Sequence, residues 1–284
     1  MGYGPGYHNP GLFFIAAASR AWYTDERPMA QPYLSIIIPA YNEAERIPQT
    51  LIDMDKRLAA APYSYEIIVV NDGSTDNTAE VVRNMWDKMI KNLKLLDVVE
   101  NKGKGGTVRT GMLAATGQIR IFTDADNSTS IDQFDQMIPL FKEGYDVVIG
   151  SRAVRGAKLD PAEPLIRQIP GKLGNLVIQA LLLPGLWDTQ CGFKAFTAEA
   201  AQKLFTLSRI GGWGFDVEIL SLAKAMGFRI KEVPVHWVND TRSHVKASAY
   251  LKFLWETFTI RWWLWRGKYD ILASQPVDNQ QKPI

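Results

Sequence analysis

The segment IFTDAD, from Ile121 to Asp126, decides the fold and points to the site. The residues before its two aspartates are apolar or β-favouring and predict the end of a buried strand. Residues two apart in an extended chain point to the same side, so Asp124 and Asp126 are expected to project together beyond the sheet edge. Two converging carboxylates favour a hard divalent cation, Mg²⁺ or Mn²⁺. A solvated acidic turn is the alternative explanation for the pair taken alone.

Strand-like and helix-like segments alternate on both sides of this segment. Buried-strand patterns predict strands at residues 34–38, 66–70, 93–99, 118–123, 146–149 and 228–235. Helical spacing of apolar residues predicts helices at 43–60, 76–92, 103–115, 130–143, 164–183, 197–206, 215–226 and 248–266. This alternation predicts an α/β fold with a mostly parallel central sheet flanked by helices.

The composition excludes several classes of protein. A formal net charge of +2 gives no electrostatic case for a nucleic-acid partner. A single cysteine, Cys191, excludes an internal disulfide framework and fits a reducing compartment. No stretch is long and apolar enough to predict a membrane-spanning helix, and no secretory signal is expected. We expect an N-terminal extension at residues 1–30, a main domain at 31–240, and an amphipathic helix with a tail at 241–284.

Polar clusters follow four successive strands of the predicted sheet. PAYNE (39–43) follows the first strand, NDGSTD (71–76) the second, NKGKGG (101–106) the third, and the aspartate pair the fourth. Each cluster alone is explained by a helix cap, a turn or a solvated basic loop. Because ligands of such sheets bind beyond the carboxyl ends of the strands, the four clusters together predict one binding site.

This combination resembles the family 2 glycosyltransferases, nucleotide-sugar enzymes with the GT-A fold, over residues 33–240. Three segments are similar to signatures of the dolichyl-phosphate and polyprenyl-phosphate β-glucosyltransferases: GKGGTVRTG (103–111), DTQCGFK (188–194) and WGFDVE (213–218). The related dolichol-phosphate mannose synthases usually carry a Thr-Ser-Gly-Phe-Arg type of segment in place of residues 189–194. The resemblance therefore favours glucose over mannose.

The resemblance implies a metal-dependent, inverting transfer of glucose from UDP-glucose to a polyprenyl (dolichyl-type) phosphate. It implies that Asp124 and Asp126 hold Mg²⁺ or Mn²⁺, with Ser128 as a third ligand. It also assigns binding of the nucleotide sugar to residues at the first four strand ends, namely Pro39, Ala40, Tyr41, Glu43, Asp72, Lys104, Arg109 and Asp124. For Arg109, a solvated position near the helix start is the alternative.

The acceptor side of the site is expected to come from the second half of the chain. A phosphate monoester is already ionised at neutral pH, so its attack needs cations more than a strong general base. Arg152 and Arg167 are the candidates for binding that phosphate, with Gln190 beside them, because arginine suits bidentate phosphate contact. The resemblance implies that Asp216 matches the region where many members of the family keep a catalytic aspartate, so Asp126, Asp216 and Arg152 are the candidate catalytic residues. For Asp216 and Gln190, a structural role is the alternative.

A lipid acceptor also needs an apolar surface, and two segments offer one. Residues 173–187 are strongly apolar, and either the core or an interface explains them. The helix at 248–266 combines aromatic and basic side chains, as helices in the membrane interface do: Trp255, Trp262, Trp263 and Trp265 with Lys252, Arg261 and Arg266. We expect peripheral attachment to the cytoplasmic face of a membrane. The alternative is that both helices simply cover the sheet.

Three other functions are compatible with parts of this pattern. One is a polyprenyl-phosphate mannosyltransferase that uses GDP-mannose, since the base-contacting residues do not identify the base. Another is a family 2 glycosyltransferase with a soluble acceptor, in which the tryptophan-rich helix would belong to the core. The third is a nucleotide-binding protein that has lost catalysis, and the intact Asp124 and Asp126 pair argues against it.

Overall fold

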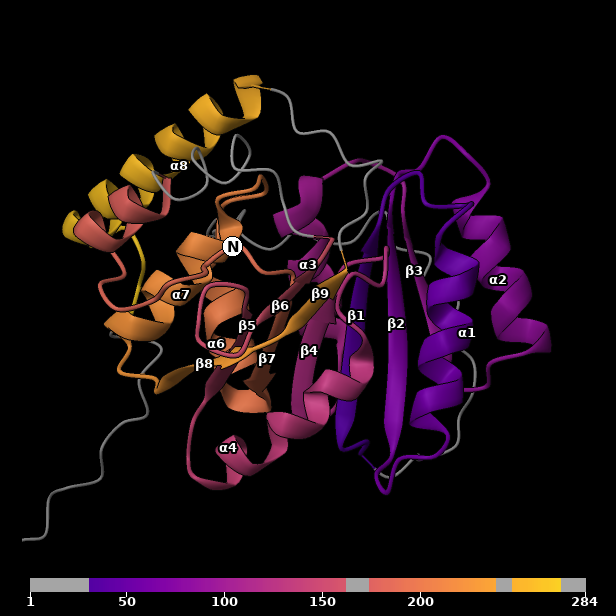
Figure 1. Ribbon diagram of the computed structural model, residues 1–284. Coiled ribbons are helices and arrows are strands. Elements are labelled where there is room, and N and C mark those ends of the chain that lie inside the picture. The colour runs from indigo at the N-terminus through magenta and orange to yellow at the C-terminus, as the bar shows by residue number, and fades with distance from the viewer. Residues whose placement is uncertain (1–30, 162–173, 239–246, 272–284) are drawn as a thin grey trace, which may run out of the picture.

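A seven-stranded mixed sheet organises the chain (Figure 1). The computed structural model describes residues 31–161, 174–238 and 247–271. The strand order is β3-β2-β1-β4-β7-β5-β8, and β6 and β9 form a separate two-stranded sheet. The strands are β1 (Leu34–Ala40), β2 (Tyr65–Asp72), β3 (Leu93–Val98), β4 (Ile119–Thr123), β5 (Val147–Ser151), β6 (Lys158–Asp160), β7 (Phe193–Thr197), β8 (Ile230–Pro234) and β9 (His236–Val238).

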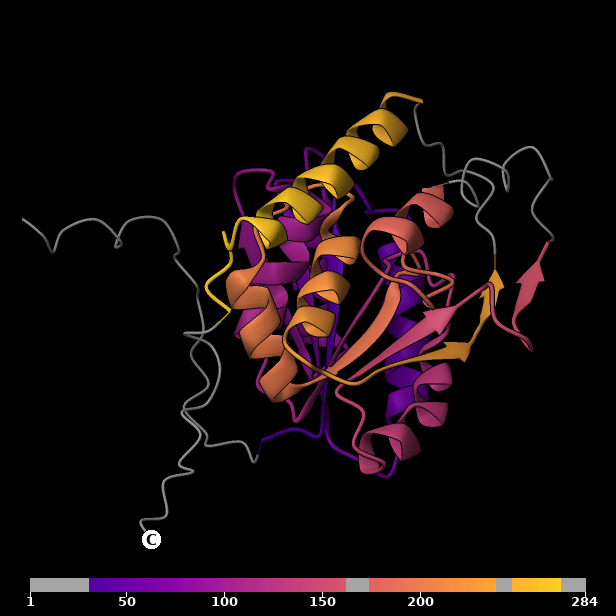
Figure 2. The ribbon, with the colours of Figure 1, turned by 90° about the vertical axis from the view of Figure 1, so that its left-hand side faces the viewer.

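Helices cover both faces of the large sheet, as the sequence predicts (Figures 1 and 2). One face packs against α1, α2, η1 and α4, and the other packs against α3, α6 and α7, with α8 beyond α7. The helices are α1 (Ile47–Leu58), α2 (Thr78–Lys88), α3 (Gly103–Ala114), the 3₁₀ helix η1 (Ile131–Gln136), α4 (Ile138–Lys142), α6 (Ala198–Leu207), α7 (Phe215–Ala225) and α8 (Ala247–Trp265).

The parallel strands β1, β2 and β4 bring their carboxyl ends to one edge of the sheet. β1 reads LSIIIPA, and its unbroken apolar run suits a strand that is buried on both faces. It pairs in parallel with β2, where Ala40 lies opposite Asn71, and with β4, where Ile37 lies opposite Phe122. The predicted convergence of the strand-end clusters follows from this register.

Strand β7 runs antiparallel between β4 and β5 and was not predicted from the sequence. Its first residue, Phe193, lies opposite Thr123, the last residue of β4. The antiparallel direction therefore brings the preceding segment, residues 188–192, to the same edge as Asp124. One motif from the second half of the chain reaches the site in this way.

The helix predicted at 130–143 is instead two short helices, η1 and α4. Pro139 lies in the first turn of α4, where its missing N–H costs nothing and its fixed φ suits a helix start. A continuous helix through this position would lose a hydrogen bond. The helix predicted at 43–60 is observed as α1, and its apolar residues at helical spacing are all buried: Ile47, Leu51, Met54 and Leu58.

Helix α8 presents an aromatic stripe to solvent and a mixed stripe to the core. The exposed stripe follows the spacing i, i+3, i+7, i+10 and consists of Trp255, Phe258, Trp262 and Trp265. Trp263 lies away from this stripe and packs on Tyr269 of the core, with 6.0 Å between the ring centroids. No helix within the described ranges is long and apolar enough to cross a bilayer.

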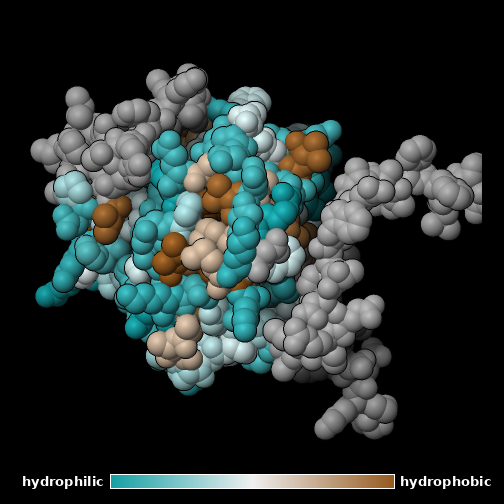
Figure 3. Space-filling model, turned by 90° about the vertical axis from the view of Figure 1, so that its right-hand side faces the viewer, coloured by the Kyte–Doolittle hydropathy of each residue, from teal (hydrophilic) through white to brown (hydrophobic). Residues whose placement is uncertain are grey.

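The segment predicted as an apolar helix at 164–183 lies only partly within the described residues. Residues 174–181 are helical. Ile178 and Leu183 are buried in the core on the α3 face, whereas Leu176 and Trp187 are exposed. The core interpretation therefore holds for Ile178 and Leu183, and the interface interpretation stays a prediction for the exposed side chains. The opposite end of the molecule, beside α1 and α2, presents a mainly hydrophilic surface with scattered apolar patches (Figure 3).

Candidate active site at the carboxyl edge of the sheet

Lys104 and Asp124 form an ion pair at this edge. The Lys104 ammonium lies 2.6 Å from Asp124 Oδ1, and both side chains are partly exposed. Lys104 comes from the first turn of α3, and Asp124 directly follows β4. Burial disfavours the charge on Lys104, but Asp124, Asp216 and Asp126 outweigh it, so the pKa of the ammonium is raised above its ordinary value. A positive charge is therefore retained at this edge, beside the two aspartates.

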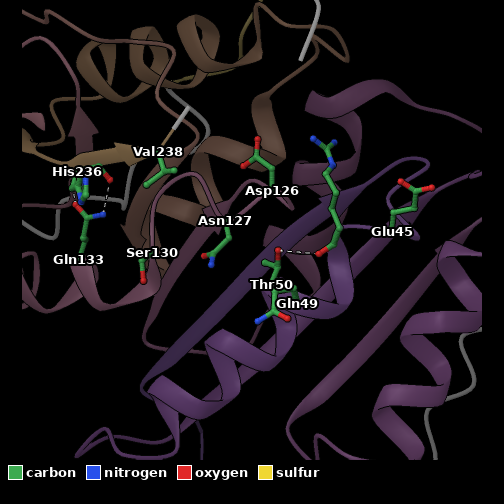
Figure 4. Close-up of a pocket in the computed structure, with 10 residues that line it drawn as sticks. Glu45, Gln49, Thr50, Asp126, Asn127, Ser130, Gln133, His236 and Val238 are labelled. Atoms are coloured by element: carbon green, nitrogen blue, oxygen red, sulfur yellow. Dashed lines mark hydrogen bonds between the residues drawn. The ribbon is translucent and has the colours of Figure 1, made fainter. Parts of the chain in front are cut away.

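Asp126 faces a different neighbour from Asp124. Its Oδ1 accepts a hydrogen bond of 3.0 Å from the backbone N–H of Ser128. It also lines a polar cavity of about 460 Å³ between the segment after β4 and the start of α1 (Figure 4). Asn127 and Ser130 line this cavity from the same segment, and Gln49 and Thr50 line it from α1. The two aspartates thus flank one edge, one beside a cation and one beside a cavity.

The donor set around Asp126 fits a hard divalent cation. Ser128 is buried, and its hydroxyl has no hydrogen-bond partner among the described residues. An unpartnered buried hydroxyl beside a carboxylate offers oxygen ligands of the kind that Mg²⁺ and Mn²⁺ prefer. Within the described ranges no three His, Cys, Asp or Glu side chains gather around one point. Ligand oxygens would therefore have to complete the coordination of an ion held by Asp126, Asp124 and Ser128.

The first two strand-end clusters are joined to each other by Asn42. Its backbone lies in the left-handed region, with φ of 56°. Its side-chain oxygen accepts a hydrogen bond of 2.8 Å from the N–H of Thr75, and its own N–H donates to Ser74 Oγ at 2.9 Å. Glu43 donates its N–H to Thr78 and pairs with Arg46. The structure therefore brings these two clusters together, as predicted.

Asp72 connects the second cluster to the third. The side chain is buried, and its Oδ1 accepts a hydrogen bond of 2.8 Å from the N–H of Lys102. Pro39 and Ala40 end β1 beside it, with Ala40 buried and Tyr41 exposed. One Asp72 oxygen is therefore committed to the loop before α3. Among the residues predicted to bind the nucleotide sugar, Tyr41 has a strongly exposed side chain.

Glycines allow the loops of the site to approach closely. A Cβ added at Gly192, in the segment before β7, would lie 2.0 Å from Asp124 Oδ2. A Cβ at Gly103 would lie 2.5 Å from the carbonyl oxygen of Gly211, and the φ of Gly103 is +74°. Larger residues at either position would displace Lys104 or Asp124 from its partner.

Asp216 lies in a buried ion pair with Lys194. The Lys194 ammonium is 2.5 Å from Asp216 Oδ1 and lies over the ring of Phe122 at 5.3 Å from its centroid. Burial raises the pKa of the Asp216 carboxyl above its ordinary value, although Lys194 and Lys104 act in the opposite direction. The arrangement fits the alternative named for Asp216, a structural role, better than contact with an acceptor.

Arg152 is held by Asp188, a residue of the DTQCGFK segment. Its Nε and Nη2 donate to the two carboxylate oxygens at 2.7 and 2.9 Å, and its N–H donates to Oδ2 at 2.9 Å. Burial alone would raise the pKa of Asp188, but Arg152 and Lys194 hold it below its ordinary value. The guanidinium also lies 4.8 Å from the ring centroid of Trp237. A role in binding acceptor phosphate remains a prediction for Arg152.

Of the other predicted site residues, Arg109 and Gln190 lie within the described part of the chain. Arg109 donates to the carbonyl oxygen of Thr206 at 3.4 Å, on α6, so the structure gives no contact between Arg109 and the aspartates. The N–H of Gln190 donates to Asp188 at 3.2 Å, next to Arg152. Arg167 lies outside the described residues.

Sequence reasoning missed four residues of this region. Lys194 and Asp188 belong to segments that the sequence singled out only as signatures, and their ion pairs needed the position of β7. Trp213 lies half-exposed with its ring 5.2 Å from the Lys104 ammonium. Glu256, a charged residue amid the aromatic residues of α8, is buried. A lone carboxylate within a mostly apolar helix was the available signal for Glu256.

Comparison with known protein sequences identifies the family of the chain. A model of glycosyl transferase family 2 matches residues 35–205. The chain is 38% identical over 224 residues to a dolichyl-phosphate β-glucosyltransferase of Dictyostelium discoideum, covering 75% of this chain and 68% of the relative. It is 31% identical over 251 residues to the enzyme of the same name from Homo sapiens, covering 84% of this chain and 74% of the relative.

Solved structures of other proteins share the fold of this chain. One is a glucosyl-3-phosphoglycerate synthase from Mycobacterium tuberculosis in complex with Mn²⁺, uridine diphosphate and phosphoglyceric acid; it has a TM-score of 0.62 and 20% identity, covering 81% of this chain and 78% of that one. Another is a mannosyl-3-phosphoglycerate synthase from Rubrobacter xylanophilus, with a TM-score of 0.62 and 15% identity, covering 89% and 79%. These matches show the GT-A fold, and the chain belongs to glycosyl transferase family 2.

Proposed function

We propose that this protein transfers glucose from UDP-glucose to a polyprenyl phosphate of the dolichyl type, with inversion at the anomeric carbon. One observation carries the proposal: Lys104 lies against Asp124, two residues before Asp126, at the carboxyl edge of the sheet. The similarity to dolichyl-phosphate β-glucosyltransferases supports the sugar and the acceptor. A cation beside two carboxylates suits a nucleoside diphosphate that a metal ion accompanies.

The donor would lie along the ends of β1, β2 and β4. Lys104 would contact the diphosphate, since its ammonium already lies beside Asp124. Tyr41 and Asp72 would bind the nucleoside, the first through its exposed ring and the second through its second carboxylate oxygen. The half-exposed indole of Trp213 borders the same space. Asp72, Lys104 and Trp213 each have a protein partner before the donor arrives.

A divalent cation, Mg²⁺ or Mn²⁺, would be held by Asp126 and Asp124, with the Ser128 hydroxyl nearby. When bound, such an ion neutralises the negative charge that develops on a departing nucleoside diphosphate. Lys104 would contribute to the same stabilisation from the protein side. A solved structure of another protein with the same fold contains Mn²⁺ together with uridine diphosphate, and this supports the proposal of a divalent cation here.

The reaction would be a single displacement. An oxygen of the acceptor phosphate forms a bond to the anomeric carbon, while the bond from that carbon to the diphosphate breaks and uridine diphosphate leaves. The acceptor phosphate is already ionised, so no strong base is required. Arg152 is placed by Asp188 at the end of β5 and would bind this phosphate, together with Arg167.

The lipid part of the acceptor would approach along α8. Its exposed stripe of aromatic side chains is accompanied by basic ones, and the Arg266 guanidinium lies over the rings of Trp262 and Trp265 at 5.8 and 5.3 Å. Aromatic rings beside cations suit the headgroup region of an anionic membrane. We propose that the protein attaches peripherally through α8 to the cytoplasmic face of a membrane.

The test is a transfer assay with a panel of donors. Radiolabelled UDP-glucose, GDP-mannose and UDP-N-acetylglucosamine are each incubated with a polyprenyl phosphate and Mn²⁺, with Mg²⁺, or with EDTA, and the product is extracted into organic solvent. We expect label in the solvent phase from UDP-glucose and its loss with EDTA. If only GDP-mannose gave label in the solvent phase, the donor would be GDP-mannose and the proposal of UDP-glucose would be wrong. Transfer only to water-soluble acceptors would overturn the assignment of a lipid acceptor.

A further inference from the structure

Glu256 is a buried carboxylate on α8, on the side of the helix opposite its aromatic stripe. It is 8% exposed, and its Oε2 accepts a hydrogen bond of 2.7 Å from the N–H of Gly214. Its other oxygen packs against Gly212, where an added Cβ would lie 2.3 Å away. Burying a carboxylate is costly unless it is hydrogen-bonded. The Glu256 side chain therefore fixes residues 211–214, here called the 211–214 loop.

The other side of the 211–214 loop supports the start of α3. The carbonyl oxygen of Gly211 accepts a hydrogen bond of 2.9 Å from the N–H of Gly105. Added Cβ atoms at Gly103 and Gly105 would lie 2.5 Å from the oxygen of Gly211 and 2.4 Å from that of Ile210. The two backbones are therefore in direct contact. Any displacement of the loop would move the first turn of α3.

The first turn of α3 carries Lys104, and the 211–214 loop carries Trp213. The Lys104 ammonium lies 5.2 Å from the Trp213 ring centroid and 2.6 Å from Asp124. Contacts thus run without a break from α8, through Glu256 and the loop, to the cation beside Asp124. The C-terminal helix is in this way connected to the candidate donor site.

We propose that Glu256 is a positioning residue of the donor site, which sets Lys104 and Trp213 against Asp124 by holding the 211–214 loop. It acts through these residues and touches no substrate itself. The inference rests on the proposed function only in assigning the donor to the Lys104 side of the site. Under this proposal α8 has two roles. Its inner side supports the donor site through Glu256, and its outer side carries the aromatic stripe.

The first readout is hydrogen–deuterium exchange of the full-length protein without ligand. In Glu256→Ala, the amides of Gly214 and Gly105 are expected to exchange faster. Thr257→Val is the matched control, since Thr257 is buried on the same helix and its hydroxyl bonds only within α8 in the described structure, to the Phe253 carbonyl. The control should leave both amides as in the wild type. Unchanged exchange at Gly105 in Glu256→Ala would overturn the proposal.

The second readout is the affinity for UDP in the presence of Mn²⁺, measured by calorimetry. A lost hydrogen bond to a charged group predicts about tenfold weaker binding in Glu256→Ala. Glu256→Gln keeps an acceptor for the Gly214 N–H, and it should recover most of the affinity. If Glu256→Ala bound UDP with wild-type affinity despite faster exchange, Glu256 would support only the fold, and the proposal would be overturned.

A change on the loop itself provides an independent perturbation. Gly212→Ala places a methyl group against the Glu256 carboxylate and should weaken UDP binding as Glu256→Ala does. Because both changes break one contact, the double variant should lose little more than either single variant. Fully additive losses would contradict the proposed contact. If the wild type binds UDP with Mn²⁺ but transfers no glucose, the proposed function fails while these comparisons still test Glu256.

Discussion

Two lysine–aspartate pairs lie at the carboxyl edge of the sheet, and they differ in exposure. Lys104 and Asp124 are 2.6 Å apart, with side chains 19% and 24% exposed. Lys194 and Asp216 are 2.5 Å apart, with side chains 0% and 3% exposed. A buried pair loses much stability when one partner is removed, whereas a partly exposed pair can exchange partners at small cost. From this difference we propose that the second pair serves the fold and that the first serves a ligand.

Among the variants that test this difference, removal of Asp216 should have the largest effect, and the effect is on stability. Asp216→Ala leaves the Lys194 ammonium buried and without its carboxylate, which should lower the free energy of unfolding by about 3–5 kcal/mol. Chemical denaturation measures this loss. The control is Glu199→Ala, which breaks a surface pair with Lys203 and should cost no more than ~0.5 kcal/mol. Equal losses in the two variants would remove the distinction between the buried and exposed pairs.

Removal of the Lys104 charge should affect catalysis and leave the fold nearly intact. Lys104→Met should lower glucose transfer by about 100-fold, because a cation aimed at the leaving diphosphate is lost. The melting temperature should change little. Lys102→Met is the matched control, two residues away with an exposed side chain, and should keep wild-type activity. A large loss of stability with normal activity would assign the Lys104 pair to the fold instead.

The part of the site built by parallel strands was predictable from the sequence. Strand ends of a parallel sheet meet at one edge, so the clusters at Pro39, Asp72, Lys104 and Asp124 could be grouped before the structure was known. Each cluster is short in sequence and directly follows an apolar strand. Local sequence patterns were sufficient here because the parallel α/β arrangement places successive strand ends together.

The part built by β7 was not predictable in the same way. FKAFT at 193–197 is short, and nothing local indicates that it runs antiparallel between β4 and β5. Lys194 reads as a polar residue in sequence, and its burial depends on partners that only the fold supplies, among them Asp216, 22 residues later, and the carbonyl oxygen of Cys191. The burial of Glu256 on α8 could not be predicted for a similar reason. The aromatic residues of this helix lie on both sides, and the hydrogen bond from Gly214 places Glu256 inside.

Variants of Arg152 test whether an arginine that is already paired with Asp188 also binds a ligand. Arg152→Ala should raise the KM for polyprenyl phosphate by roughly tenfold and leave the KM for UDP-glucose unchanged. Arg152→Lys keeps the charge but loses the two-pronged geometry, and should show an intermediate value. Arg155→Ala, an exposed neighbour, is the control. Equal changes in both KM values would assign Arg152 to the general architecture of the site through Asp188.

The outward stripe of α8 should give the smallest effect, confined to lipid. Trp255 and Trp265 are 73% and 70% exposed, so replacing both with serine should spare the fold. The double variant should bind vesicles containing anionic lipid a few-fold more weakly, because apolar area leaves the interface. Met89→Ser, at an exposed site after α2, is the control in a cosedimentation assay. Unaltered binding would move the membrane contact away from α8.

Asp126 tests most directly whether the exposed edge is the donor site. Asp126→Ala should reduce glucose transfer to polyprenyl phosphate by at least ~100-fold, given what a bound metal contributes to charge stabilisation. Mn²⁺-dependent binding of UDP should fall with it, while Asp132→Ala, an exposed aspartate of η1, should match the wild type. Full transfer activity and unchanged Mn²⁺-dependent binding in Asp126→Ala would contradict the assignment of the metal and of the donor site.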